Sequence, residues 1–374
     1  MKKAFLFTFI IVAISAFATR MLSFFLPLYF DELGFNGFEI GVFFSAMAVA
    51  GLVIAFPSGI LNDRLDSRIL ILVGILLTAL HLFGLSLSKS FIPVLIFMFI
   101  YGIGDRLFKL STDSYILKKV IDRKGFRYGL YDGIRCIAAA IGIFIGGNLL
   151  FNFKISLLLS VAGLIILLSI PLLRFLPKTD ISFQKLNLYI SDIMHRRTLI
   201  FLSLLFIFTL HWGVESTVYS LFLQENLGLT TAQMGLFMSL PIIGLGAFAI
   251  YIGNKYDKGL SLKKLFFLAF MLSGFGLAMM AITNNVYLSF FFRVIHELGD
   301  GAFVVFMFVG ASSYFPKVRM GGGYGFVMLV TVISAMVSSL IFSPVGDIFG
   351  YHIPHIIVGA LVFLAGFFVF LFRR

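Results

Sequence analysis

Ionisable side chains inside long apolar stretches are the residues of this chain whose types and spacing could do chemistry. The largest group lies in two apolar stretches of the second half, at about 199–223 and 286–315. Its ionisable members are His211, Glu215, Arg293, His296, Glu297 and Asp300, and Trp212 lies among them as a polar aromatic residue. An ionised group in the centre of a bilayer costs roughly 2.5–3.5 kcal/mol even on a mild insertion scale, so these groups must face a polar cavity or one another. Desolvated carboxyl groups of this kind can exchange protons near neutral pH.

The first half carries a second group of such charges. Arg20 lies past the middle of the first apolar stretch, and Asp105 and Arg106 lie in the stretch at 91–117. The first group is net negative and this one is net positive. A charge split of this kind suits a zwitterionic solute, so both a proton-exchanging site and a zwitterion-binding site remain open.

The neighbours of each carboxylate predict different roles. Glu297 lies one turn before Asp300, and a second carboxylate disfavours ionisation. We therefore predict that Glu297 and Asp300 act as a coupled pair that carries a proton. Asp105 has the cation Arg106 beside it, and it is predicted to order that arginine and Arg20 instead.

The composition indicates which elements position these groups. Hydrophobic residues make up 60% of the chain, charged residues make up only 12%, and the mean hydropathy is +1.06. These values exclude an ordinary soluble domain. The net charge of +12 raises the question of nucleic acid. However, most Lys and Arg fall in the predicted loops of one side, and only Lys89 and Lys154 fall on the other. This asymmetry predicts cytoplasmic termini and no nucleic-acid partner.

The hydrophobic pattern predicts an all-α membrane protein with twelve spanning helices. Their expected ranges are 4–30, 38–61, 69–87, 91–117, 128–150, 155–176, 199–223, 232–253, 262–282, 286–315, 324–342 and 353–372. The longest polar segment separates two sets of six. We expect an N-terminal half at 1–177, a cytoplasmic linker with a surface helix at 178–198, and a C-terminal half at 199–374.

Two charged turns repeat between the halves. The first follows the second predicted helix, and the other lies 194 residues later, which indicates an internal duplication. The turn residues are Gly59, Asp63, Arg64, Arg68, Gly253, Asp257 and Lys258. Another glycine run, Gly321 to Gly323, lacks the context of a phosphate-binding loop and is predicted to be a cytoplasmic turn.

The first turn resembles a motif of the major facilitator superfamily of transporters, Gly-x-Leu-x-Asp-Arg-x-Gly-x-Arg between helices 2 and 3. Gly59, Asp63, Arg64 and Arg68 match it, as does Leu61, whereas Asp66 replaces the usual glycine. The resemblance implies two pseudo-symmetric six-helix bundles, alternating access, and a cavity lined by helices 1, 4, 7 and 10. It also implies that the two turns act as conformational switches.

A second partial resemblance concerns helix 5. Gly133, Gly142 and Gly146 match the first positions of a glycine pattern in exporters of that superfamily. The preferred hypothesis is therefore proton-coupled efflux of apolar or amphipathic compounds. A transporter or flippase for a zwitterionic solute or lipid head group is one alternative, and a non-transporting membrane sensor or scaffold is another.

No catalytic residues, cofactor or metal are expected. The chain has no visible nucleophile–base set, so an enzyme is not expected. Its six His are scattered without the spacing of metal ligands. We expect a monomer in the plasma membrane whose partners are a small-molecule substrate, protons and membrane lipids.

Overall fold

The computed structural model describes residues 2–23, 25–35 and 37–371, and all regular structure in them is helical. The main helices are α1 (Lys2–Ser23), α2 (Leu26–Glu32), α3 (Gly37–Arg64), α4 (Ser67–Leu87), α5 (Phe91–Lys119), α6 (Lys124–Leu149), α7 (Ile155–Leu167), α8 (Leu186–Met194), α9 (Arg196–Leu221), α10 (Thr231–Asp257), α11 (Leu262–Ile282), α12 (Val286–Tyr314), α13 (Met320–Phe349) and α14 (His352–Leu371). Short 3₁₀ turns occupy Ile170–Phe175 and Lys317–Arg319, and a π-helical turn occupies Phe222–Asn226.

The helices have the length and composition of membrane spans. Within the described residues, 11 helical segments are long and apolar enough to cross a bilayer, and α14 adds a shorter apolar stretch at His352–Phe367. Large apolar side chains are exposed on them, including Val53 (67%), Leu168 (65%) and Leu340 (71%). Such exposure suits contact with lipid. The protein is an integral membrane protein with the predicted all-α fold class.

Two local predictions are wrong. The expected first helix at 4–30 is divided into α1 and α2. Pro27 lacks the backbone N–H that a continuous helix would need there. The predicted turn at Gly321 to Gly323 is instead the first turn of α13. The predicted end of the last helix at residue 372 lies outside the described residues.

The contacts between helices divide the chain into two compact units. Unit 1 comprises Met1–Lys119, Ile137–Tyr189 and Phe315–Met328, and unit 2 comprises Val120–Cys136, Ile190–Tyr314 and Leu329–Arg374. The beginning of α6 is thus grouped with unit 2 and the beginning of α13 with unit 1. The boundaries predicted at 1–177, 178–198 and 199–374 stay a prediction.

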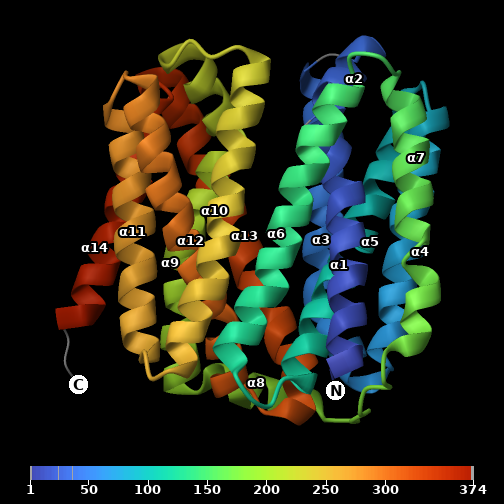
Figure 1. Cartoon of the computed structure of the whole chain (residues 1–374), viewed down its shortest axis with the longest axis vertical. Helices are drawn as coiled ribbons and strands as arrows, with labels where there is room; N and C mark the ends of the chain where they lie inside the picture. Colours follow the sequence, from blue (N-terminus) through green and yellow to red (C-terminus); the bar gives the residue numbers. More distant parts are fainter. Residues whose placement is uncertain (1, 24, 36, 372–374) are drawn as a thin grey trace. The chain divides into compact units, whose positions relative to one another are not determined.

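The same packing plan occurs in both units. In unit 1, α5 packs against α3 and α4, and α7 packs against α4 and α1. In unit 2, α12 packs against α10 and α11, and α14 packs against α11 and α9. Figure 1 shows these helices lying side by side within each unit. The six-helix repeat expected from the turn spacing is confirmed.

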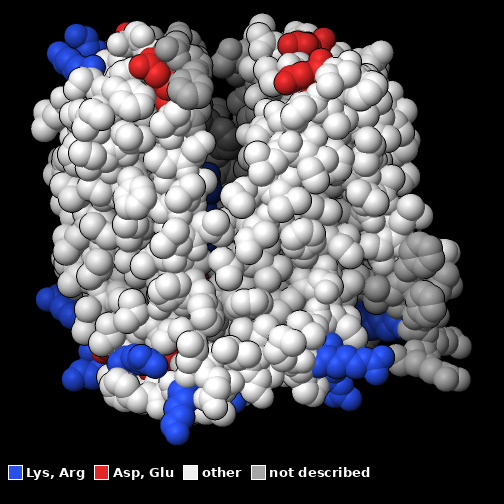
Figure 2. All heavy atoms as spheres, turned by 180° about the vertical axis from the view of Figure 1, so that it is seen from behind, with Lys and Arg blue, Asp and Glu red and all other residues white. Residues whose placement is uncertain are grey.

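Charge is distributed unevenly over the surface. On the face shown in Figure 2, the long sides of each unit are nearly free of charged side chains, and most of the visible Lys and Arg gather near one end. An uncharged belt between charged ends is the pattern expected where lipid tails cover a protein.

Candidate functional site

A group of polar side chains from α9, α11 and α12 comes together inside unit 2. We name it the acidic–histidine cluster. Its members are His211, Glu215, Ser273, Arg293, His296, Glu297 and Asp300. Helix α12 supplies four of them, and it is buried without interruption from Gly299 to Ala311. The four side chains from α12 are themselves buried, so these polar groups must satisfy one another rather than water.

Two glycines bring α11 and α12 close enough to form the cluster. A Cβ atom on Gly299 would collide with the backbone of Ser273, and one on Gly276 would collide with the backbone of His296. The helices therefore touch backbone to backbone. The Ser273 hydroxyl lies in this contact and donates to Asp300 Oδ1 at 2.8 Å.

Asp300 accepts hydrogen bonds from two helices. Besides Ser273 on α11, it contacts His211 Nε2 at 3.0 Å and Trp212 Nε1 at 3.3 Å, both on α9 and both through Oδ2. Only 8% of its side chain is exposed. Charge-assisted hydrogen bonds of this kind hold a carboxylate in one orientation.

Arg293 holds the other two carboxylates. Its guanidinium pairs with Glu215 through Nη1 and with Glu297 through Nη2. It also lies over the ring of Tyr219, with Cζ 4.5 Å from the centroid. A planar guanidinium suits this combination of two carboxylates and a ring face. Glu297 and Asp300, predicted to act as a pair, are thus held by different partners.

The two histidines have the same arrangement. Nδ1 of His211 lies 2.6 Å from the Phe208 carbonyl oxygen, and Nδ1 of His296 lies 2.9 Å from the Ser273 carbonyl oxygen. A carbonyl only accepts, so each Nδ1 carries the proton. Each Nε2 then faces carboxylate oxygens. His296 Nε2 lies 3.0 Å from Glu215 Oε1, and His211 Nε2 contacts Asp300 as described above. A proton or another cation must lie between each nitrogen and its oxygen.

The charges of the cluster do not cancel when both imidazoles are neutral. Three carboxylates stand against one guanidinium, which leaves two negative charges inside a spanning segment. An uncompensated charge there is costly. Two further positive charges make the cluster neutral, and a pair of protons or one divalent cation would supply them.

The donor atoms of His211, Glu215 and His296 all lie within 4.8 Å of one another, and these residue types are metal ligands. The six His are scattered along the sequence, but His211 and His296 lie close together in the fold.

The predicted site residues of the first half are arranged differently. In unit 1, Arg20 is exposed, whereas Asp105 and Arg106 are half-buried. Among the described residues, no hydrogen bond or ion pair joins their side chains. Nε of Arg106 is buried without a hydrogen-bond partner, and its guanidinium lies against Gly51 of α3. The ordering role predicted for Asp105 stays a prediction.

The first charged turn holds the beginning of α13. Asp63 is fully buried at the end of α3 and accepts the backbone N–H groups of Gly321 at 2.9 Å and Gly322 at 2.8 Å. It also pairs with Lys118 Nζ at 2.9 Å and accepts the Tyr189 hydroxyl at 3.1 Å. A carboxylate at a helix N-terminus satisfies free amides and interacts favourably with the helix dipole.

The second charged turn repeats this contact in unit 2. Asp257 ends α10 and accepts the N–H groups of Gly125 at 2.9 Å and Phe126 at 2.8 Å, at the beginning of α6. Gly253 lies against the backbone of Gly125. The carboxylates of the two turns therefore have equivalent positions, and each accepts two backbone N–H groups at the beginning of a helix.

The remaining turn residues have structural partners. Gly59 lies against the backbone of α13, Arg64 donates to the Gln184 carbonyl at 3.2 Å, and Lys258 caps the end of α10. Arg68 pairs with Asp66 at 2.8 Å. Asp66, where the motif has glycine, is the N-cap of α4 and accepts the N–H of Arg68. The replacement therefore keeps a tight turn by capping the next helix.

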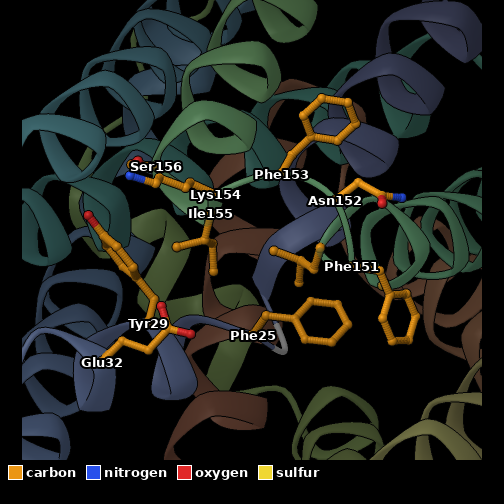
Figure 3. A pocket seen from close by; sticks show the side chains of 11 residues that line it. Phe25, Tyr29, Glu32, Phe151, Asn152, Phe153, Lys154, Ile155 and Ser156 are labelled. Carbon is orange, nitrogen blue, oxygen red and sulfur yellow. The ribbon is translucent and has the colours of Figure 1, made fainter.

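One pocket lies away from all these groups. It belongs to unit 1 and has a volume of about 610 Å³. Figure 3 shows Tyr29 and Glu32 from α2 on one side and the rings of Phe25 and Phe151 on another. None of the residues predicted for the site lines it, so the acidic–histidine cluster is the stronger candidate on chemical grounds.

Comparison with known proteins identifies the family. The model of the Major Facilitator Superfamily matches residues 8–216 and 200–374. The chain belongs to the Major Facilitator Superfamily. It is 24% identical over 245 residues to an uncharacterized MFS-type transporter of Methanocaldococcus jannaschii (62% of this chain, 63% of the relative). It is 23% identical over 242 residues to the quinolone resistance protein NorA of Staphylococcus aureus (62% of each). Each match spans just under two thirds of the relative's length.

Solved structures show the same fold. The human organic anion transporter MFSD10 (TETRAN) matches with a TM-score of 0.84 and 14% identity, over 98% of this chain and 99% of the other. The fucose:proton symporter FucP of Escherichia coli matches with a TM-score of 0.77 and 14% identity, over 98% of both chains. At these identities the likeness concerns the fold alone.

Sequence reasoning missed four residues of this superfamily member that complete its polar groups. They are Ser273 in the acidic–histidine cluster, Tyr219 against Arg293 of that cluster, and Lys118 and Tyr189 around Asp63. Ser273 had a usable signal, because it is the one hydroxyl residue in the apolar helix α11. Tyr189 lies in the polar linker, where nothing local indicates a buried partner.

Proposed function

We propose that this transporter exports apolar or amphipathic compounds by alternating access and couples the export to protons. The observation that carries the proposal is the acidic–histidine cluster. It lies in spanning helices, and with neutral imidazoles it lacks two positive charges. A group that must gain positive charge in order to be buried is suited to exchange protons during a transport cycle.

Asp300 is the proposed centre of proton coupling, with Glu297 as its neighbour. Asp300 contacts α9 through His211 and α11 through Ser273. A change in its protonation would therefore alter contacts of α12 with two other helices. The proposed substrate cavity comprises Arg20, Asp105, Arg106, His211, Trp212, Glu215, Arg293 and His296.

Two observations support export. One is the similarity to a quinolone resistance protein. The other is the partial match of Gly133, Gly142 and Gly146 in α6 to the glycine pattern of exporters. Cβ atoms on Gly133 and Gly142 would lie 2.6 Å and 2.5 Å from backbone oxygens of Gly246 and Phe17. These glycines therefore serve close helix packing. From the charge asymmetry we further propose cytoplasmic termini. We also propose a monomer in the plasma membrane.

Arg106 supports a second candidate substrate class. Its guanidinium has a buried Nε without a partner, and an anionic group of a solute would satisfy it. Together with the negative cluster of unit 2, this favours a zwitterionic solute or lipid head group as the alternative cargo.

Transport in proteoliposomes tests the proposal. A panel of amphipathic cations, neutral compounds and zwitterions is measured with and without a pH gradient. We expect accumulation that depends on the gradient. Asp300→Asn should abolish gradient-driven accumulation but leave exchange measurable, whereas Asp105→Asn should weaken binding or folding. Full gradient-driven transport by Asp300→Asn would overturn the assigned coupling residue, and transport indifferent to the gradient would overturn proton coupling.

A further inference from the structure

We propose that His211, Glu215, His296 and Asp300 bind one divalent transition metal ion, with Zn²⁺ as the best fit. The four residues form two pairs with a spacing of four, one pair on α9 and one on α12. Each helix therefore presents one imidazole and one carboxylate on a single face. The inference concerns binding, and it holds whatever compound the transporter carries.

Some of the distances between donor atoms are close to those around a tetrahedral ion. His211 Nε2 lies 3.0 Å from Asp300 Oδ2, His296 Nε2 lies 3.0 Å from Glu215 Oε1, and His296 Nε2 lies 3.9 Å from Asp300 Oδ1. Ligands bonded to Zn²⁺ at about 2.0–2.1 Å in a tetrahedron lie about 3.3–3.4 Å apart. The donor atoms of His211, Glu215 and His296 are spread over up to 4.8 Å, and the two histidines face different oxygens of Asp300, so a bound ion would draw these side chains closer together.

The proposed ligand side chains have the hydrogen-bond partners that metal ligands commonly have. Each histidine gives its Nδ1 hydrogen to a backbone carbonyl, which leaves the Nε2 lone pair for an ion. Ser273 donates to Asp300, and Arg293 holds Glu215. Outer partners of this kind fix the orientation of metal ligands and are worth about 10–100-fold in affinity.

The charge and the donor types indicate the class of ion. A divalent cation cancels the two negative charges left by Glu215, Glu297, Asp300 and Arg293 with neutral imidazoles. Two imidazole nitrogens select first-row transition metals over Ca²⁺ and Mg²⁺, which prefer oxygen alone.

The exposure of the ligands indicates a route of entry. Both histidine side chains are fully buried, whereas 18% of the Glu215 side chain is exposed. Glu215 is therefore the ligand that an incoming ion meets first.

Metal content of the purified full chain tests the proposal directly. The protein is stripped with a chelator in detergent and dialysed against Zn²⁺, and the bound metal is measured by mass spectrometry. We expect one Zn²⁺ per chain. Co²⁺ serves as a second probe, because a four-coordinate site gives much stronger visible absorption than an aqueous ion. Absence of bound Zn²⁺ in the wild-type protein would overturn the proposal and leave protons as the neutralising charges.

Variants locate the site. His296→Gln should lose the bound ion, and the milder Ser273→Ala should bind it roughly 10–100-fold more weakly. His355→Gln is the matched control. His355 is also buried in unit 2, with Nδ1 2.8 Å from the Tyr351 carbonyl, but no ion pair joins it to a carboxylate among the described residues. It should bind Zn²⁺ like the wild type.

Unchanged Zn²⁺ affinity in both His296→Gln and Ser273→Ala would overturn the proposal, because the metal would then lie elsewhere. A bound ion and the protons of the proposed coupling are alternative neutralising charges of the same cluster, but metal content is measured without transport, so the two proposals can fail separately. Proton-driven export can fail while Zn²⁺ binds, and it can be intact in a protein that binds none.

Discussion

Replacing Asp63 by asparagine removes a charge at a fully buried position and changes little in shape. The wild-type carboxylate accepts two N–H groups of α13 and pairs with Lys118, whose side chain is only 9% exposed. In Asp63→Asn, the ammonium of Lys118 keeps its contact with the Asn62 carbonyl at 2.6 Å but loses its counter-ion. An uncompensated buried charge and a weakened helix cap follow.

The size of the effect can be worked out from these contacts. Removing one partner of a buried ion pair costs about 3–5 kcal/mol. The charge at a helix N-terminus is worth up to about 2 kcal/mol when partly buried. Because both values describe the same carboxylate, they overlap, and we expect a loss of about 3–5 kcal/mol. At roughly 2 °C per kcal/mol for a long chain, the apparent melting temperature falls by roughly 6–10 °C.

The assay is thermal unfolding in detergent with two comparison variants. Asp257→Asn removes the charge and one of two N–H acceptors of the corresponding cap in unit 2, where no ion pair joins Asp257 to a cation among the described residues. It should therefore cost only about 0.5–2 kcal/mol. Adding Lys118→Met to Asp63→Asn removes the unpaired charge and should recover at least half of the loss. The reasoning is refuted if Asp257→Asn is as damaging as Asp63→Asn, or if the double variant melts below the single one.

Three further predictions use the same assay. Gly59→Ala should lower the melting temperature by an amount equivalent to about 1–3 kcal/mol, because the new Cβ would lie 2.5 Å from a backbone oxygen of α13. Gly235→Ala, with nothing within 4 Å, should be neutral or stabilising, and equal losses in both would contradict the packing argument. Burial raises the pKa of Asp66, but hydrogen bonds and the charge of Arg68 outweigh it and hold that pKa below its ordinary value. The stability lost in Asp66→Asn should therefore be constant above about pH 5 and vanish as the pH falls below about 4; a pH-independent difference would contradict this. Arg293→Met should cost about 3–5 kcal/mol by leaving two carboxylates unpaired, and Arg293→Lys should cost less; equal losses would show that the charge is not what matters.

The sequence predicted the helices and the repeat because both depend on local patterns. Hydrophobic length marks each span, and the spacing of Asp63 and Asp257 marks the duplication. It also named the ionisable members of the acidic–histidine cluster, because charge within a span is conspicuous. It did not predict that His211 and His296 approach each other. That contact depends on how α9 and α12 are rotated about their axes, and no local pattern specifies this rotation.

The two charged turns have equivalent positions, but the carboxylate of the first turn makes more interactions than that of the second. Both carboxylates cap the beginning of a helix, α13 for Asp63 and α6 for Asp257. The rest of α13 belongs to unit 2 and the rest of α6 belongs to unit 1, so each cap holds a helix that continues into the other unit. Since only Asp63 adds a buried ion pair and the Tyr189 hydroxyl to its cap, releasing it costs more than releasing Asp257. If the turns act as switches, the first turn therefore contributes the larger part of the free-energy barrier to the conformational change.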